Sequence, residues 1–384
     1  MDILDVKNYT SGSWIQQFEY KSFLPTKITQ QWLFSNPKLL IKLGEADRYL
    51  GRLDSFSELI PDIDFFIKMH VAKEATVSSK IEGTQTTFKD VLIKQEDINP
   101  EKRDDWQEVH NYIEALNHAI ISLETLPISN RLIKQTHQIL LKGVRGKHKL
   151  PGNYRSSQNW IGKTLKDAIF IPPVHTEIPD LMADLEQFTN AEKINLPIEI
   201  PHLLKIAIIH YKFETIHPFL DGNGRIGRLL ITLYLTEKNI LRKPTLYLSD
   251  YFERHRRDYY DNLTEVRTKN DMEQWLFFFL DGIIETAKKS IEAFQKIMVL
   301  RDEIELNKLI QLGRKQTDAK TLINQLYKNP IVSSKDVASV LSVHPSTANR
   351  IIKDFENLDI LTEITGYSRN RIYAFTEYIN IFNA

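Results

Sequence analysis

Residues 217–228 read HPFLDGNGRIGR, which places a histidine, a carboxylate, an asparagine, two arginines and three glycines close together. Before this stretch, PHLLKIAIIHYKF at 201–213 repeats apolar residues with a helical period. The same period continues after it over residues 224–237. We therefore expect two apolar helices joined by a glycine-rich turn, in a fold that is mainly α.

The glycines of this turn formally match the dinucleotide fingerprint G-x-G-x-x-G over residues 222–227. That fingerprint requires an apolar strand before it and a βαβ unit around it. Here the preceding segment has helical period and enters the turn through Pro218. The context excludes a Rossmann interpretation.

The residue types of the turn suit a nucleoside triphosphate and a metal ion. A glycine turn that opens a helix exposes backbone N–H groups and the positive end of the helix dipole, which together attract anions. Arg225 and Arg228 can both reach phosphate oxygens, and Asn223 offers an amide donor. Asp221 is a hard oxygen ligand suited to Mg²⁺. His217 can act as a base near neutral pH. A plain helix start would explain the glycines alone, without these other side chains.

Composition restricts the class of protein. The chain has 384 residues, is 42% hydrophobic and carries 50 basic and 50 acidic residues, so its formal net charge is zero. It contains no cysteine, which excludes disulfides and favours a reducing compartment. The start MDILDVKNYTSG is polar and unlike a secretory signal, and no uncharged apolar run is as long as a membrane span. We expect a cytoplasmic protein.

The chain divides into four parts by pattern. We expect an N-terminal helical region over 1–95, a helical central domain over 96–295, a charged linker over 296–316 and a small domain over 317–384. The small domain has three short helical patterns followed by two strands around a glycine turn. Within the central domain, NWIGKTLKDAIFIPP at 159–173 predicts a short β-hairpin.

The stretch 217–228 resembles the signature of the Fic family of protein adenylyltransferases (AMPylators), H-P-F-x-[D/E]-G-N-G-R-x-x-R, at every specified position. PGNYR at 151–155 and the hairpin at 159–173 resemble the family segment that forms the flap holding the target. The tail at 317–384 resembles a winged helix-turn-helix. The resemblance implies a Fic-fold helical bundle with a short β-hairpin flap, with 96–295 as the catalytic domain.

The resemblance also implies an activity. AMP would be transferred from ATP, with Mg²⁺, to a Tyr, Thr or Ser hydroxyl of a target protein or of the chain itself, and pyrophosphate would be released. His217 would deprotonate the hydroxyl, Asp221 would hold Mg²⁺, and Arg225 would stabilise the departing pyrophosphate. Phe219 would pack into the core and fix the loop. The implied ATP-binding residues are Gly222, Asn223, Gly224, Arg225, Gly227 and Arg228.

Upstream, SSKIEGTQTT at 78–87 resembles the inhibitory motif [S/T]-x-x-x-E-[G/N] of the subclass whose inhibitory helix is N-terminal in the same chain. Ser78, Glu82 and Gly83 occupy its specified positions. Glu82 could form a bidentate pair with Arg228 and so occupy the group meant for the γ-phosphate. An ordinary helix that ends at Gly83 with a solvated glutamate would produce the same pattern.

Two other functions stay open. Glu82 could position water to remove AMP from a modified protein, or the chain could be a DNA-binding regulator that senses nucleotide. Residues 317–384 carry seven basic and seven acidic residues, with basic ones at Arg350 and Lys353 and in the wing at Arg369 and Arg371. This neutral balance favours docking on protein, or a homodimer, over DNA binding.

The remaining histidines show no metal-ligand spacing, so we predict no zinc site. His210 lies on an apolar helix and is expected to pack behind the site. The other histidines considered are His137, His148, His175 and His202.

Overall fold

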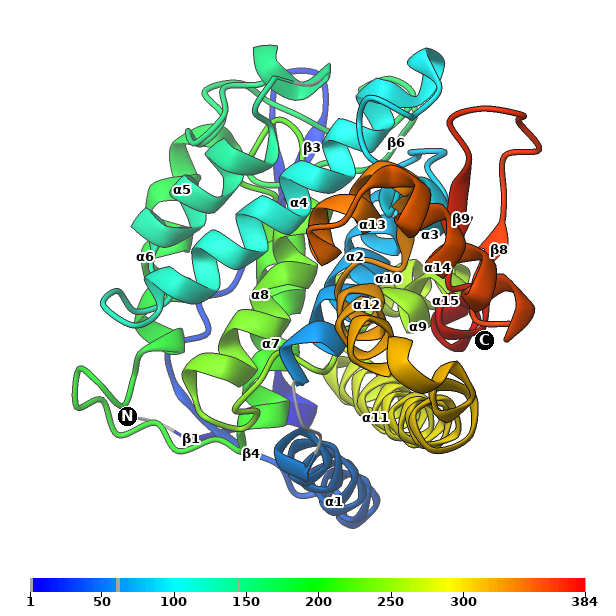
Figure 1. Cartoon of the computed structure of the whole chain (residues 1–384). Helices are drawn as coiled ribbons and strands as arrows, with labels where there is room; N and C mark the ends of the chain where they lie inside the picture. The colour runs from blue at the N-terminus through cyan, green and yellow to red at the C-terminus, as the bar shows by residue number, and fades with distance from the viewer. Residues whose placement is uncertain (1–2, 60–62, 144, 384) are drawn as a thin grey trace.

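The computed structural model describes residues 3–59, 63–143 and 145–383, and it is mainly helical, as the sequence predicts (Figure 1). None of the helices in these ranges is long and apolar enough to cross a membrane. The α-helices are α1 (Pro37–Leu59), α2 (Ile63–Ile81), α3 (Phe88–Val91), α4 (Arg103–Ser122), α5 (Asn130–Leu140), α6 (Ile178–Thr189), α7 (His202–Ile216), α8 (Asn223–Glu237), α9 (Ser249–Arg254), α10 (Arg256–Lys269), α11 (Met272–Glu303), α12 (Gln316–Lys328), α13 (Ser334–Leu341), α14 (Pro345–Asn357) and α15 (Thr376–Asn383).

Helices α7 and α8 flank the glycine-rich turn and form the centre of the molecule (Figure 1). Every residue of α7 from Leu203 to Ile216 is buried. A helix that is apolar on all sides is stable only when other elements enclose it. Here α7 packs against α6, α8 and α11, while α8 also contacts α2, α4 and α5. The turn between them is therefore held from both sides.

The strands are short and lie around this helical core. The hairpin expected at 159–173 is present as β5 and β6, in which Ile161 pairs with Phe170. In the described residues the strands are β1 (Ile3–Asp5), β2 (Gly12–Gln16), β3 (Lys21–Pro25), β4 (Gln31–Leu33), β5 (Ile161–Gly162), β6 (Ala168–Phe170), β7 (Ile331–Ser333), β8 (Thr362–Glu363) and β9 (Ile372–Ala374).

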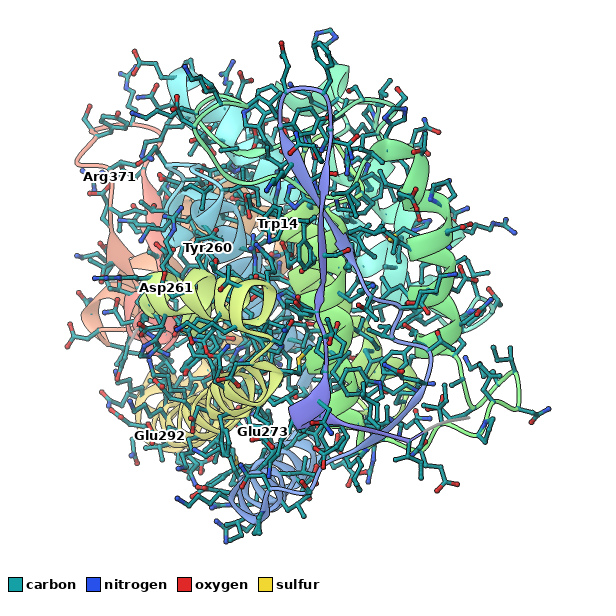
Figure 2. The ribbon with its side chains drawn as sticks, turned by 180° about the vertical axis from the view of Figure 1, so that it is seen from behind. Trp14, Tyr260, Asp261, Glu273, Glu292 and Arg371 are labelled. Carbon is teal, nitrogen blue, oxygen red and sulfur yellow. The ribbon has the colours of Figure 1, made fainter. Side chains whose placement is uncertain are left out.

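The prediction of a helical region over 1–95 is wrong for its first third, which forms β1 to β4. Strands β2 and β3 pair as an antiparallel hairpin, on which Figure 2 labels Trp14. Phe23 donates its N–H to the Ile171 carbonyl and its ring packs near Phe170, so the hairpin is anchored on the β5–β6 flap. These partners lie far away in sequence, which a local pattern cannot reveal.

The prediction of a separate linker over 296–316 is also wrong. Helix α11 continues to Glu303, and a π-helical turn (Ile304–Lys308) and a 3₁₀ segment (Leu309–Lys315) connect it to α12, with a kink at Gly313 (φ 53°). Ile297 and Leu300 are buried, as is Leu309 beyond the end of α11. The charged residues of this stretch occupy the outer face of a packed helix, so the C-terminal part continues directly from the core.

The C-terminal part contains three helices at the expected places, α12, α13 and α14, followed by strands β8 and β9. Two elements were not expected from the sequence. Strand β7 pairs with β9 to give an antiparallel sheet of order β7-β9-β8, and α15 closes the chain. This part packs on α2: the Phe66 ring lies near Tyr327 and Tyr378, and His70 lies near Phe382.

Candidate active site

The turn between α7 and α8 has a constrained backbone at both ends. His217 closes α7 in the left-handed region (φ 50°, ψ 60°), and its N–H bonds to the Phe213 carbonyl at 2.9 Å. Gly222 has φ 77° and directly precedes α8. A non-glycine residue with positive φ is uncommon and persists only where its surroundings fix it. The histidine is thus held where one helix ends and the next begins.

Asn223 stabilises the turn from within. Its Oδ1 accepts the Phe219 N–H at 2.8 Å, and its Nδ2 donates to the Phe219 carbonyl at 2.8 Å. The Asn223 side chain, which was expected to face phosphate, therefore uses its amide group to hold the turn together. The backbone N–H groups at the start of α8, from Asn223 onward, are the groups left to face an anion.

Arg155 holds the turn from outside. The sequence analysis noted the segment PGNYR that contains it but assigned Arg155 no role. This arginine is 2% exposed and donates to the carbonyls of His217, Ser157 and Pro173, while its own N–H donates to Pro218. Asn159 adds a bond to the Phe219 carbonyl at 2.9 Å. Both residues precede or begin the flap, so they tie the flap to the turn.

We expect Arg155→Met to lower the free energy of unfolding by about 3 kcal/mol, because it leaves buried carbonyls without donors. Urea denaturation of the full chain measures this. Arg131→Met, at an exposed arginine of α5, is the matched control and should change stability little. A loss below about 1 kcal/mol at Arg155 would contradict this account of the turn.

His137 on α5 is a second supporting residue that sequence reasoning missed. Its ring stacks on Phe219 at 3.7 Å between centroids, and its Nε2 lies 2.9 Å from the Asp221 carbonyl. Its Nδ1 accepts the Gly152 N–H, so Nε2 carries the proton and donates. Burial lowers the pKa of His137 to about 4. The ring is thus neutral and positions the turn.

Asp221 and Arg225 lie together at the open side of the turn. The Asp221 side chain is 43% exposed, and its Oδ1 lies 3.6 Å from Arg225 Nη2. Arg225 is buried, with Nη1 3.4 Å from Glu108 of α4, a partner not predicted from the sequence. The Nε of Arg225 has no hydrogen-bond partner within the described ranges. An exposed carboxylate beside an incompletely bonded arginine can accept a metal ion and an anion together.

Arg228 is fully engaged by the segment identified as inhibitory. Its Nη2 donates to Glu82 Oε1 at 2.7 Å and to the Ser78 carbonyl at 2.9 Å, and its Nε donates to Ser78 Oγ at 2.9 Å. Ser78 lies in α2 and Glu82 just beyond its end, where Gly83 has φ 102°. Burial alone would raise the pKa of Glu82, but the charge and hydrogen bond of Arg228, together with the charge of Arg225, outweigh burial, so this pKa is lowered. Glu82 is therefore an anion at neutral pH.

Glycines make this contact with Glu82 sterically feasible. A Cβ at Gly224 would lie 2.3 Å from Glu82 Oε1, and a Cβ at Gly227 would lie 2.1 Å from Glu214 Oε1. Gly224 is the second residue of α8, so the Glu82 carboxylate lies at a helix N-terminus. Burial raises the pKa of Glu214 to about 7. The first turn of α8 thus holds a carboxylate where a phosphate oxygen could bind.

His217 lies beside this charged group. Burial lowers the pKa of the His217 imidazole to about 4, and Arg155 acts in the same direction while Glu82 opposes it. The Nδ1 atom has no hydrogen-bond partner among the residues the structure describes. The imidazole is neutral at pH 7 and can accept a proton.

His210 lies at the place expected from the sequence. Nδ1 of His210 lies 2.9 Å from the Gly227 carbonyl and its Nε2 lies 2.9 Å from the Tyr259 hydroxyl, so it packs behind α8. No cluster of three or more metal-ligating side chains occurs within residues 3–59, 63–143 and 145–383.

Two family models match this part of the chain. Residues 40–121 match the Fic/DOC family N-terminal model, and residues 127–235 match the Fic/DOC family model. The first range contains the Ser78–Glu82 segment and the second contains the whole glycine-rich turn. The two segments that meet at Arg228 therefore come from the two matched regions.

Curated proteins give a consistent result. A probable protein adenylyltransferase of Aquifex aeolicus is 34% identical over 114 residues, which are 30% of this chain and 32% of that protein. The protein adenylyltransferase Fic of Culex quinquefasciatus is 32% identical over 130 residues, which are 34% of this chain and 23% of that protein. The match thus spans about a third or less of these relatives.

Solved structures share the fold. A Fic family protein from Desulfovibrio desulfuricans superposes with a TM-score of 0.58 at 21% identity, covering 90% of this chain and 98% of that one. Fic-1 from C. elegans gives a TM-score of 0.53 at 22% identity, covering 69% and 75%. With this fold, the two matched regions and the complete signature at 217–228, the chain belongs to the Fic/DOC family.

Proposed function

We propose that the chain is an autoinhibited protein adenylyltransferase that moves AMP from ATP to a Tyr, Thr or Ser hydroxyl. The observation that carries the proposal is the Glu82 carboxylate at the start of α8, 2.7 Å from Arg228 and against Gly224. A helix N-terminus with a buried arginine is an anion site, and here it holds the chain's own anion. The names of the curated relatives, protein adenylyltransferases, support the same reaction.

In the proposed reaction, Arg228 binds the γ-phosphate once Glu82 has moved away. Backbone N–H groups of Asn223 and Gly224 face the other phosphates, while the Gly222 N–H donates to Asp221 Oδ1 at 2.6 Å. Arg225 stabilises charge on the departing pyrophosphate through its unbonded Nε. Asn223 keeps the turn in place through its side chain. Gly227 allows α8 to pass close to Glu214.

Asp221 fits the metal ion that this reaction requires. Mg²⁺ usually takes one or two carboxylates and completes its shell with phosphate oxygens and water. Asp221 offers a single, half-exposed carboxylate next to the turn, which matches a donor set of this kind. When bound, Mg²⁺ would neutralise phosphate charge, and Asp221 would hold it.

His217 takes the proton from the target hydroxyl. Its neutral ring lies at the end of α7 beside the anion site, and the negative charge of a bound triphosphate would raise its pKa from about 4 toward the working range. The β5–β6 flap, tied to the turn by Arg155 and Asn159, would hold the segment of the target that carries the hydroxyl.

The proposal is tested with ATP labelled in either the α- or the γ-phosphate. The Glu82→Gly chain, incubated with Mg-ATP, should incorporate α-label and gain the mass of one AMP, while γ-label stays in solution. EDTA should stop incorporation if Asp221 acts through a metal. Nucleotide binding without α-label in protein would instead favour a nucleotide sensor. Release of AMP from a previously labelled protein would favour the reverse reaction.

For the C-terminal part we propose docking on protein. Lys353 and Arg371 line a groove of about 1010 Å³ whose other wall includes Asp97, and Lys94 pairs with Asp336 across it. An acidic wall opposite the basic residues disfavours duplex DNA in this arrangement. The groove joins the winged-helix-like part to residues 94–97, which follow the segment that carries Glu82 in the sequence.

A further inference from the structure

A cavity of about 70 Å³ lies behind helix α2, away from the glycine-rich turn. Its walls come from α2, from α9 and the segment before it, from α11 and from the C-terminal helix α15. Figure 1 shows these elements gathered beside α2. Ile381 and Phe382 of α15 close one side, so the cavity exists only where the C-terminal part meets the core. Its size suits a group of a few heavy atoms.

Two buried polar atoms in this wall have no hydrogen-bond partner among the described residues. They are Nε2 of His70, which is 9% exposed, and the hydroxyl of Tyr247, which is 7% exposed. Buried polar groups in folded proteins are almost always hydrogen-bonded, so such a pair facing one cavity indicates a ligand. Burial lowers the pKa of His70 to about 3, so its ring is neutral and can still donate from one nitrogen.

Two lysines and two carboxylates line the cavity, and both carboxylates already accept bonds or ion pairs from their neighbours. Lys73 Nζ lies 3.9 Å and Lys289 Nζ 3.6 Å from opposite oxygens of Asp250. Asp250 also accepts a bond of 2.9 Å from Arg254, which pairs with Glu285 at 2.6 Å as well. The second carboxylate in the wall, Glu74, accepts bonds from Tyr112 and Ser249 instead.

We propose that this cavity binds a phosphate-sized oxyanion. Two donors in its wall are unbonded, the Tyr247 hydroxyl and the His70 ring nitrogen, and the ammonium groups of Lys73 and Lys289 line the same wall. An oxyanion offers several acceptor oxygens around one centre, which these donors can share. A neutral apolar molecule would leave the two buried donors unbonded.

A bound oxyanion would also affect the inhibition by Glu82, and this part of the inference rests on the proposed function. Helix α2 contributes His70 and Lys73 to the cavity and Ser78 to the bond with Arg228. An oxyanion would tie α2 to α11 in the arrangement in which Glu82 pairs with Arg228. A ligand that binds one arrangement preferentially increases its population. Binding should therefore strengthen the inhibited state.

The test titrates inorganic phosphate, and separately sulfate, into the full chain by calorimetry and thermal melting. We expect phosphate to bind and raise the melting temperature, and Tyr247→Phe and Lys289→Gln each to weaken binding about tenfold or more. Lys288→Gln is the matched control, because Lys288 points to Glu45 of α1. It should bind phosphate as the wild type does.

Tyr247→Phe is informative even if stability changes. It removes a buried hydroxyl without a partner, so the variant should be at least as stable as the wild type without phosphate. If no binding were detected at about 20 mM phosphate, the dissociation constant would be too high for a specific site, and the proposal would be refuted. Binding that survives both substitutions would also overturn it, since the anion would then lie elsewhere, as on Arg228.

A second readout tests the link to Glu82. Phosphate should lower α-label incorporation by the wild type and leave the Glu82→Gly chain unaffected. Equal inhibition of both would refute the link, because phosphate would then compete directly with ATP. The binding measurements involve no AMP transfer, so they stand even if the proposed activity fails.

Discussion

Replacing Glu82 by glycine is expected to raise the rate of AMP transfer by about 100-fold or more. In the wild type, Arg228 is bonded to Glu82 and Ser78 and is almost completely buried. A triphosphate that cannot reach Arg228 binds out of line, and a misplacement of about 1 Å costs about 100-fold in rate. Initial rates of α-label incorporation, measured side by side, give the ratio.

Because of the position of Glu82, its replacement by glycine should leave the fold unchanged. The residue follows the last residue of α2, so glycine there does not interrupt the helix. Glu82→Gln should raise the rate less, because an amide of the same shape still fills the space beside Gly224. Glu96→Gly, at an exposed loop glutamate, is the control and should leave the rate unchanged. Equal labelling of the wild type and the Glu82→Gly chain would refute an inhibitory role for Glu82.

The sequence predicted the parts of the site that are contiguous. The turn at 217–228 combines the end of one helix, positive-φ glycine and the start of the next helix, and all of these are local properties. The pair between Glu82 and Arg228 joins residues 146 apart. It was anticipated only because the segment at 78–87 resembles a known motif, since spacing alone cannot bring them together.

The supporting residues could not be predicted in the same way. His137, Arg155 and Glu108 reach the turn from α5, the segment before the flap, and α4. Each bonds to backbone or side chains of the turn, and no local pattern records which surface a helix presents to another. The segment PGNYR, which contains Arg155, was recognised in the sequence, but the bond from Arg155 to the His217 carbonyl could not be predicted from it.

The two fold predictions that failed have a common cause. In residues 12–25, the short β2–β3 hairpin is stabilised by Phe170 and Ile171 of the flap rather than by its own periodicity. In residues 296–316, frequent charged residues obscure the apolar pattern of the sequence, although Leu300 and Leu309 are buried. In both cases tertiary contacts decide what local composition leaves ambiguous.

Removing the imidazole of His217 is expected to reduce AMP transfer by a factor of about 100 to 10,000, the usual contribution of a general base. The experiment uses the Glu82→Gly background, where transfer is measurable. His217→Ala removes the base but also places alanine at φ 50°, which costs stability. His217→Asn removes the base and tolerates this conformation, so the two variants separate chemistry from strain.

Binding of ATP provides the decisive comparison for His217. The phosphates contact α8 and the arginines, so affinity for ATP should stay within a few-fold in both variants while transfer is lost. His175→Ala, at an exposed histidine, should transfer AMP normally. If His217→Asn kept transfer within tenfold of its parent, the proton would be leaving by another route. The neutral ring at the end of α7 would then only position the turn.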